Sequence, residues 1–190
     1  MLLRRAALLA LLCGCPGPQP VAPGPCTPQR PAGDLSQPVQ LLPITLDGQG
    51  ALHALHDGDP VLLQTPPQGG YVIYAGVAAL NLEACGAVIT AQLLDATSGT
   101  PVTGLDQRSV DFTVASAGYF WPADGYTQTA NIPSCPDALH LGVVGRSAIL
   151  RVDVSDANQR TARVEVNVTP ACGAGDARCA CLCGPNPAGC

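Results

Sequence analysis

Between residues 39 and 169 the chain alternates apolar and polar residues, and this alternation limits the fold more than any other feature. Segment 149–155 is apolar at alternate positions, and segment 163–168 has valine at every second position. Because successive side chains of a strand point to opposite faces, each segment has one apolar face to bury. Turns rich in glycine, proline and aspartate separate the segments. The pattern predicts an all-β fold, a single antiparallel β-sandwich, over residues 39–170.

Three further segments are expected to be strands of this sandwich. Residues 71–82 are apolar at nearly every position, which is typical of a central strand covered on both faces. Residues 88–93 and 110–114 alternate in the same way as the later segments. Short strands at this spacing indicate a two-layer sandwich.

The last two strands form a hairpin whose register the charges select. Facing residues share one side of the sheet, so only every second register is allowed. One such register places Asp153 opposite Glu165, and like charges directly opposite are destabilising. The other register pairs Arg151 with Glu165, Asp153 with Arg163 and Ser155 with Thr161, across a loop at residues 156–160. The sequence predicts this second register.

The composition limits both the compartment and the partners of the chain. Charged residues are 12% of the chain, and all nine cations are arginine. A nucleic-acid-binding protein needs a basic surface, which a net charge of −5 does not supply. Ten cysteines are too many for a reducing cytosol unless they bind metal. The composition therefore favours an exported protein and argues against nucleic acid as a partner.

The first fifteen residues have the order of an export signal. Arg4 and Arg5 form a basic start, residues 6–12 are apolar, and Gly14 precedes Cys15. Seven apolar residues rise about 10 Å as a helix, too little to cross a hydrocarbon core of about 30 Å. The order resembles the lipobox of bacterial lipoproteins. That resemblance implies a signal peptide over residues 1–14 and a Cys15 that carries diacylglycerol and an amide-linked fatty acid such as palmitate.

A proline-rich tether is expected to follow over residues 15–38. Eight of the nineteen prolines lie within residues 16–38. Proline fixes φ and removes a donor, so neither a helix nor a central strand is available. As polyproline II, at ~3.1 Å per residue, such a disordered tether would reach about 70 Å. Pro16 stands where an aspartate would retain a Gram-negative lipoprotein in the inner membrane, so the resemblance implies the outer membrane.

Two resemblances bear on the architecture. Residues 150–169 resemble the last two strands of bacterial immunoglobulin-like and PKD-type modules, which implies an immunoglobulin-like sandwich. A wider resemblance is to uncharacterised lipoproteins of high-GC Gram-negative bacteria, which combine a lipobox, a proline-rich spacer, D-G-D-P-V and P-P-Q-G-G motifs and a C-x-C-x-C tail. Here these motifs are residues 57–61, 66–70 and 179–183. The resemblance implies an outer-membrane location, periplasmic or surface-facing, and no particular activity.

Eight cysteines remain for disulfides once Cys13 leaves with the signal and Cys15 is lipidated. They are Cys26, Cys85, Cys135, Cys172, Cys179, Cys181, Cys183 and Cys190. Cys85 and Cys135, the two within the sandwich, are predicted to pair. In an extended tail over residues 171–190, the three cysteines at 179, 181 and 183 point to one side. Each is therefore expected to bond to Cys172, Cys190 or Cys26.

A thiolate metal site is the alternative use of the cysteine-rich tail. Clustered cysteines bind zinc or Cu(I), but the C-x₂-C spacing and a neighbouring histidine are absent. An oxidising compartment also favours disulfides over thiolates. No metal and no other cofactor is predicted.

Four of the seven aromatic residues gather in one short stretch. They are Tyr119, Phe120, Trp121 and Tyr126. If exposed, they could stack on a sugar ring or anchor a protein partner. If buried, they close one end of the sandwich, and the scarcity of aromatic residues elsewhere favours burial.

Two of the three histidines stand beside carboxylates in segment 53–59. On a strand, His53 and His56 would face opposite sides, so they could not share a metal ion. A strand that ends in an aspartate-rich turn explains the segment better. Loop aspartates Asp57, Asp59 and Asp156 offer oxygen ligands suited to calcium, but the chain contains no full calcium loop.

Catalytic motifs are absent from the sequence. It contains no G-x-S-x-G elbow, Walker loop or H-E-x-x-H pair. His140 stands near Asp137 and Ser147, but sequence proximity alone makes a weak triad, and His140 is expected to be a loop residue. No catalytic residue and no enzymatic activity is predicted.

These observations predict a lipid-anchored lipoprotein of the cell envelope that presents a disulfide-stabilised β-sandwich in a structural or adhesive role. Its first partner is the membrane, through the lipid on Cys15. The alternative function is a module that binds envelope polysaccharide or a secreted protein through the aromatic residues between 119 and 126.

Overall fold

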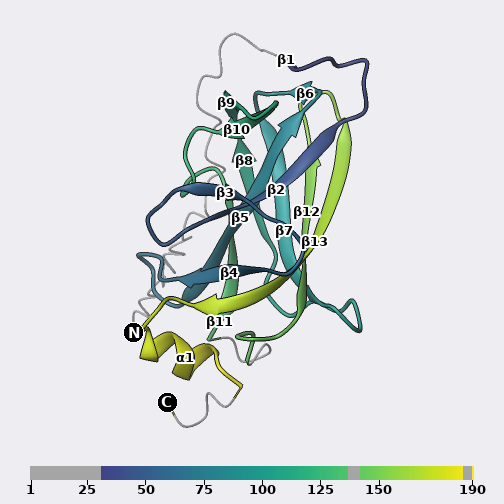
Figure 1. Cartoon of the computed structure of the whole chain (residues 1–190). Coiled ribbons are helices and arrows are strands. Elements are labelled where there is room, and N and C mark those ends of the chain that lie inside the picture. The colour runs from purple at the N-terminus through teal and green to yellow at the C-terminus, as the bar shows by residue number, and fades with distance from the viewer. Residues whose placement is uncertain (1–30, 137–141, 186–189) are drawn as a thin grey trace, which may run out of the picture.

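The computed structural model describes residues 31–136, 142–185 and 190 (Figure 1). The strands are β1 (Pro31–Ala32), β2 (Gln40–Leu46), β3 (Leu52–Ala54), β4 (Asp59–Gln64), β5 (Tyr71–Leu80), β6 (Leu82–Glu83), β7 (Ala87–Asp95), β8 (Asp106–Val110), β9 (Phe112–Ser116), β10 (Tyr119–Pro122), β11 (Ala130–Cys135), β12 (Ala148–Ser155) and β13 (Thr161–Cys172), and the helix is α1 (Ala177–Cys183). The predicted all-β fold is confirmed. The predicted signal peptide, Cys15 and Cys26 lie outside the described residues.

Strand β5 is the centre of the first layer. It pairs antiparallel with β2, β10 and β11, while β3 extends the layer beyond β2 and β9 extends it beyond β10. Every residue of β5 except the last is buried. The prediction of a central strand covered on both faces is confirmed.

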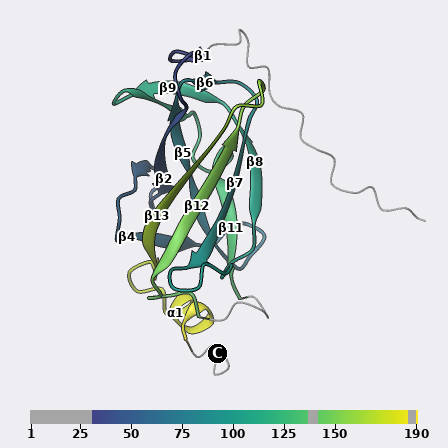
Figure 2. The same cartoon turned by 90° about the vertical axis from the view of Figure 1, so that its right-hand side faces the viewer.

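The second layer contains β4, β13, β12, β7 and β8 in that order, and Figure 2 shows β13, β12 and β7 side by side. Strand β4 also pairs with β5 and thereby joins the two layers. The order places β11 beside β5 in one layer and β13–β12–β7 in the other, so the two layers form a sandwich. One pair departs from a wholly antiparallel sandwich, because β4 runs parallel to β13.

The hydrophobic core lies between the layers. Alternate residues of β5, β7 and β12 point into it, as the period of two requires. The other face of β5 has a smaller cluster around Tyr74, against which Leu52 of β3 packs. Fully buried core side chains include Ile73, Val77, Ile89, Leu93, Leu150 and Val152. Each contributes about 1.5–3 kcal/mol by its removal from water.

The register of the final hairpin agrees with the prediction. Strands β12 and β13 pair Arg151 with Glu165, Asp153 with Arg163 and Ser155 with Thr161. Both charge pairs are formed: Arg163 Nε lies 2.6 Å from Asp153 Oδ1, and Arg151 Nε lies 2.7 Å from Glu165 Oε1. The predicted opposite charges therefore meet across the hairpin.

The strand expected over residues 110–114 is instead divided between the two layers. Strand β8 ends at Val110 and pairs with β7, whereas β9 begins at Phe112 and pairs with β10. Asp111 lies at the crossing, where its Oδ1 accepts a hydrogen bond from the backbone N–H of Gly86 at 2.9 Å. The alternating pattern continues through Asp111 while the chain changes partners, so the pattern alone did not reveal the break.

The end of the predicted tether is fastened to the sandwich. Strand β1 pairs with β6. The Asn81 side-chain amide donates to the carbonyl of Pro38 at 2.9 Å, and its Oδ1 accepts from the backbone of Asp34 at 3.0 Å. The Arg160 guanidinium also donates to the Gln37 and Asn81 carbonyls. Residues 31–38 therefore belong to the folded unit.

Candidate functional site

The cysteine-rich tail is helical, and the extended tail that the sequence predicts is wrong. Helix α1 begins after Asp176, whose side chain accepts a hydrogen bond from the backbone N–H of Cys179 at 2.9 Å. Residues four apart share one face of a helix. Accordingly Cys179 and Cys183 are both fully buried, while Cys181 is exposed. The three cysteines therefore do not point to one side.

Two disulfides join this helix to the sandwich. Cys183 bonds to Cys135 at the end of β11, and Cys179 bonds to Cys172 at the end of β13. The third described bond links Cys181 to Cys190. The predicted partners of these three cysteines are Cys172, Cys190 and Cys26. Cys179 and Cys181 bond to two of them, whereas Cys183 bonds to Cys135, which is not among them.

The predicted pairing of Cys85 with Cys135 is wrong. Cys135 lies at the end of the sandwich where α1 packs, whereas Cys85 follows β6 at the opposite end (Figure 1). A disulfide requires Cα atoms within about 7 Å, which this separation along the strands does not allow. Cys85 is nevertheless disulfide-bonded, and its partner lies outside the described residues.

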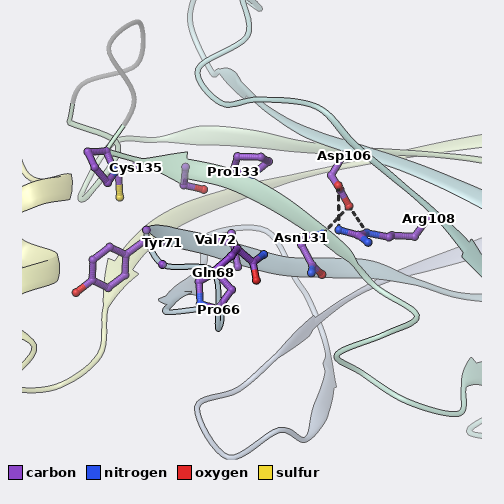
Figure 3. A pocket seen from close by; sticks show the side chains of 13 residues that line it. Pro66, Gln68, Tyr71, Val72, Asp106, Arg108, Asn131, Pro133 and Cys135 are labelled. Carbon is purple, nitrogen blue, oxygen red and sulfur yellow. Dashed lines mark hydrogen bonds and ion pairs between the residues drawn. The ribbon is translucent and has the colours of Figure 1, made fainter. Parts of the chain in front are cut away.

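A groove of about 490 Å³ opens beside the Cys135–Cys183 disulfide (Figure 3). Its walls come from four parts of the chain: the loop at residues 66–70, the start of β5, strand β8 and strand β11. Asn131 and Pro133 of β11 lie opposite Tyr74 and Val72 of β5. Paired residues share one face of a sheet, so this face is the one turned away from the main core.

An ion pair forms the polar end of the groove. Asp106 and Arg108 lie two apart on β8 and thus on one face of the strand. Arg108 Nε lies 2.8 Å from Asp106 Oδ2, and its Nη2 donates to Oδ1 at 3.3 Å. Asp106 Oδ2 also accepts from the backbone N–H of Asn131 at 2.8 Å. The carboxylate thus holds β8 against β11 and fixes the guanidinium in the groove.

Asn131 supplies an unused acceptor at the groove. Its Oδ1 is buried and has no hydrogen-bond partner among the described residues. A buried acceptor without a donor costs about 1–3 kcal/mol, so a donor supplied by a bound molecule would be favourable there.

The opposite end of the groove is tied to the tail helix. Tyr71 points away from the ion pair toward α1 (Figure 3), and its hydroxyl donates to Asp176 Oδ1 at 3.2 Å. Burial raises the pKa of the Tyr71 hydroxyl, so it remains a donor at neutral pH. The helix cap, Tyr71 and the Cys135–Cys183 bond together support this end of the groove.

The aromatic residues predicted to form one patch are divided between two faces. Phe120 pairs with Ala79 of β5 and is partly buried against the main core, so the predicted burial is confirmed only in part for this residue. Tyr119 and Trp121 project to the other face, and Trp121 Nε1 donates to the Ser116 carbonyl at 3.0 Å. These two side chains are half-buried.

The fourth aromatic residue, Tyr126, lies on the surface. Its ring meets the Tyr74 ring edge to face, with centroids 5.2 Å apart. It remains 46% exposed, which leaves a face open to a ligand.

The histidines each pair with a different carboxylate. His53 Nε2 lies 2.8 Å from Asp47 Oδ2, and His56 Nδ1 lies 3.3 Å from Asp59 Oδ2. Asp47 accepts hydrogen bonds from the His53 side chain and from the backbone N–H groups of Ala51 and Gln49. Together these bonds lower the pKa of Asp47 to about 2. The two histidines are therefore not brought together, as the alternation of side chains predicted.

The aspartates considered as calcium ligands are occupied as acceptors. Asp57 accepts hydrogen bonds from the backbone and the side chain of Asn167. Asp156, in the loop between β12 and β13, accepts one from the backbone N–H of Glu83. Over residues 31–136, 142–185 and 190, no three histidine, cysteine or acidic side chains gather into a metal site. The His140 and Asp137 of the weak triad lie outside the described residues.

Comparisons of the chain with protein-family models, with curated proteins and with solved structures found no match. In the part of the chain that the structure describes, no helix has the length and apolar character needed to cross a membrane.

Proposed function

We propose that the chain is a lipid-anchored protein of the bacterial cell envelope, which presents its sandwich in a structural or adhesive role and is not an enzyme. The observation that carries the proposal is the state of the cysteines. All seven cysteines among the described residues are disulfide-bonded. Disulfides persist in oxidising compartments such as the periplasm and the cell surface. An exported chain with a lipobox-like start is anchored there through Cys15.

The placement of the two ends supports such an anchored module. Residues 31–38 are attached at the β1–β6 end of the sandwich, and α1 lies at the opposite end in both views (Figures 1 and 2). Fifteen residues separate Cys15 from Pro31, which would reach about 45 Å as polyproline II. A lipid on Cys15 would thus hold the β1–β6 end toward the membrane and leave the α1 end facing outward.

Metabolic labelling tests the anchor. In a Gram-negative host fed labelled palmitate, we expect the wild-type chain to become labelled and to sediment with the outer membrane. Globomycin, which blocks the lipoprotein signal peptidase, should cause the precursor to accumulate. Cys15→Ser should abolish the label, and Cys13→Ser is the matched control that should keep it. Equal labelling of Cys15→Ser and wild type, or an unlabelled wild-type chain, would contradict the proposal.

A further inference from the structure

We propose that the groove between residues 66–72, β8 and β11 binds a neutral oligosaccharide, recognised through its hydroxyl groups. The proposal rests on the adhesive role above, for which it names a ligand class, but it does not depend on the lipid. The groove reaches Cys135, which the disulfide to Cys183 joins to α1, and an anchored chain would turn this end away from the membrane.

The polar groups of the groove suit hydroxyls. The Asp106–Arg108 pair is neutral as a unit, so the groove carries no net charge to attract an ion. Its two bonds to Asp106 occupy two of the five N–H donors of Arg108. Gln68 and Asn131 add side-chain amides, each with both donors and an acceptor. A sugar hydroxyl also donates and accepts, so it matches this mixture better than a carboxylate or an ammonium group does.

The unpaired acceptor of Asn131 also favours a ligand that carries hydroxyl groups. Asn131 Oδ1 lacks a donor among the described residues, while the Asn131 backbone is held by Asp106. This oxygen is closed to solvent here, so a ligand hydroxyl would satisfy it after a rotation of the Asn131 side chain into the groove. Beside it, the exposed Pro133 and the largely buried Val72 give the groove an apolar surface for the C–H face of a sugar ring.

An added peptide strand is disfavoured because the free edge of β11 is blocked. One edge of β11 pairs with β5. On the other edge, the Asn131 N–H donates to Asp106, the Pro133 carbonyl accepts from Gly104 N at 3.1 Å, and proline has no N–H. Strand addition needs a row of open backbone groups. A ligand in the groove must therefore be recognised mainly by side chains.

The groove is held in shape before any ligand arrives. Three of its walls are strands of the sandwich, and the Cys135–Cys183 disulfide with the Tyr71–Asp176 hydrogen bond braces its α1 end. A preformed site loses less conformational freedom on binding.

Isothermal titration calorimetry on the full, oxidised chain tests the proposal. The probes are cellohexaose, maltohexaose and mannohexaose, with hexagalacturonate as the charged ligand and an unstructured hexapeptide as the protein-like ligand. We expect at least one neutral hexasaccharide to bind, and to bind more tightly than the other two classes. Gln68→Ala and Asn131→Ala should each weaken its binding by roughly three- to tenfold, the loss of one ligand hydrogen bond.

Two variants control for the location of the site. Gln107 is exposed on the opposite face of β8 from Asp106 and Arg108, so Gln107→Ala should leave binding unchanged. Trp121→Ala should also leave it unchanged, since Trp121 does not line the groove. If Asn131→Ala unfolds, the exposed loop residue Gln68 decides the result. The proposal is overturned if no neutral hexasaccharide binds, if the charged or peptide probe binds more tightly, or if a control variant loses as much as Gln68→Ala.

Discussion

The Cys135–Cys183 disulfide is expected to stabilise the fold more than the Cys172–Cys179 disulfide, although both join α1 to the end of a strand. The first bond closes a sequence separation of 48 residues, and the second closes one of 7. A cross-link lowers the entropy of the unfolded chain, and the effect grows with the logarithm of the loop length. Both bonds attach the same helix face to the end of a strand, and their loop lengths differ almost sevenfold.

The loop-entropy relation gives the magnitude of this difference. At 25 °C it assigns about 4.1 kcal/mol to the Cys135–Cys183 bond and about 2.4 kcal/mol to the Cys172–Cys179 bond. The difference of about 1.7 kcal/mol corresponds to roughly 3–7 °C in Tm for a domain of this size. Cys181–Cys190, with a separation of 9, closes a loop only slightly longer than that of Cys172–Cys179.

Urea unfolding under non-reducing conditions measures these contributions. The variants are the double replacements Cys135→Ala/Cys183→Ala and Cys172→Ala/Cys179→Ala, with Cys181→Ala/Cys190→Ala as the exposed control. We expect the first to have the lowest free energy of unfolding. A Cys172→Ala/Cys179→Ala variant that loses as much stability as the Cys135→Ala/Cys183→Ala variant, or more, would rule out loop length as the cause.

Three further predictions concern the sandwich itself. Leu150→Ala should lower the free energy of unfolding in urea by about 2–5 kcal/mol because Leu150 is fully buried. Leu105 is 56% exposed, so Leu105→Ala should change it by about 0.5 kcal/mol or less. Equal losses in the two variants would contradict the placement of Leu150 in the core. Asp153→Arg should lower the urea midpoint, because it places an arginine opposite Arg163. Adding Arg163→Asp should restore most of the lost midpoint. A double variant no more stable than Asp153→Arg alone would show that the Asp153–Arg163 pair makes no contribution. The Asp47 carboxylate, with a folded pKa of about 2 against an ordinary 3.8, should add stability above about pH 4 that is lost as the pH falls toward 2. Asp47→Asn should remove this pH dependence, and an NMR titration that gives Asp47 an ordinary pKa would contradict it.

The sandwich could be predicted because its signals are local. A continuous apolar run and opposite charges across one hairpin depend on neighbouring residues, and they predicted the central strand β5 and the β12–β13 register correctly. The break at Asp111 and the parallel β4–β13 pair depend on which distant strands meet, which alternation does not encode.

The predicted extended tail is wrong because its cysteine spacing fits two structures. Alternate cysteines suggest a strand, but Cys179 and Cys183 are also one helical turn apart, and Asp176 stands at a helix start. The aspartate before this spacing was the signal that could have revealed the helix. The disulfide partners then followed from the packing of α1 against β11, which the sequence does not show.

The groove left even less trace in the sequence. Its lining comes from segments around residues 68, 106 and 131, which only the fold brings together. The one local sign is the D-x-R spacing of Asp106 and Arg108, which places both side chains on one face of a strand. The orphan acceptor of Asn131 is a property of packing and has no signal in the sequence.

Mass spectrometry of the protein isolated from host membranes tests the lipid anchor on Cys15. We expect a polypeptide that begins at Cys15, lacks residues 1–14, and carries diacylglycerol on its first sulfur and a fatty acid on its first amine. A chain that retains Met1, with no lipid on Cys15, would contradict it.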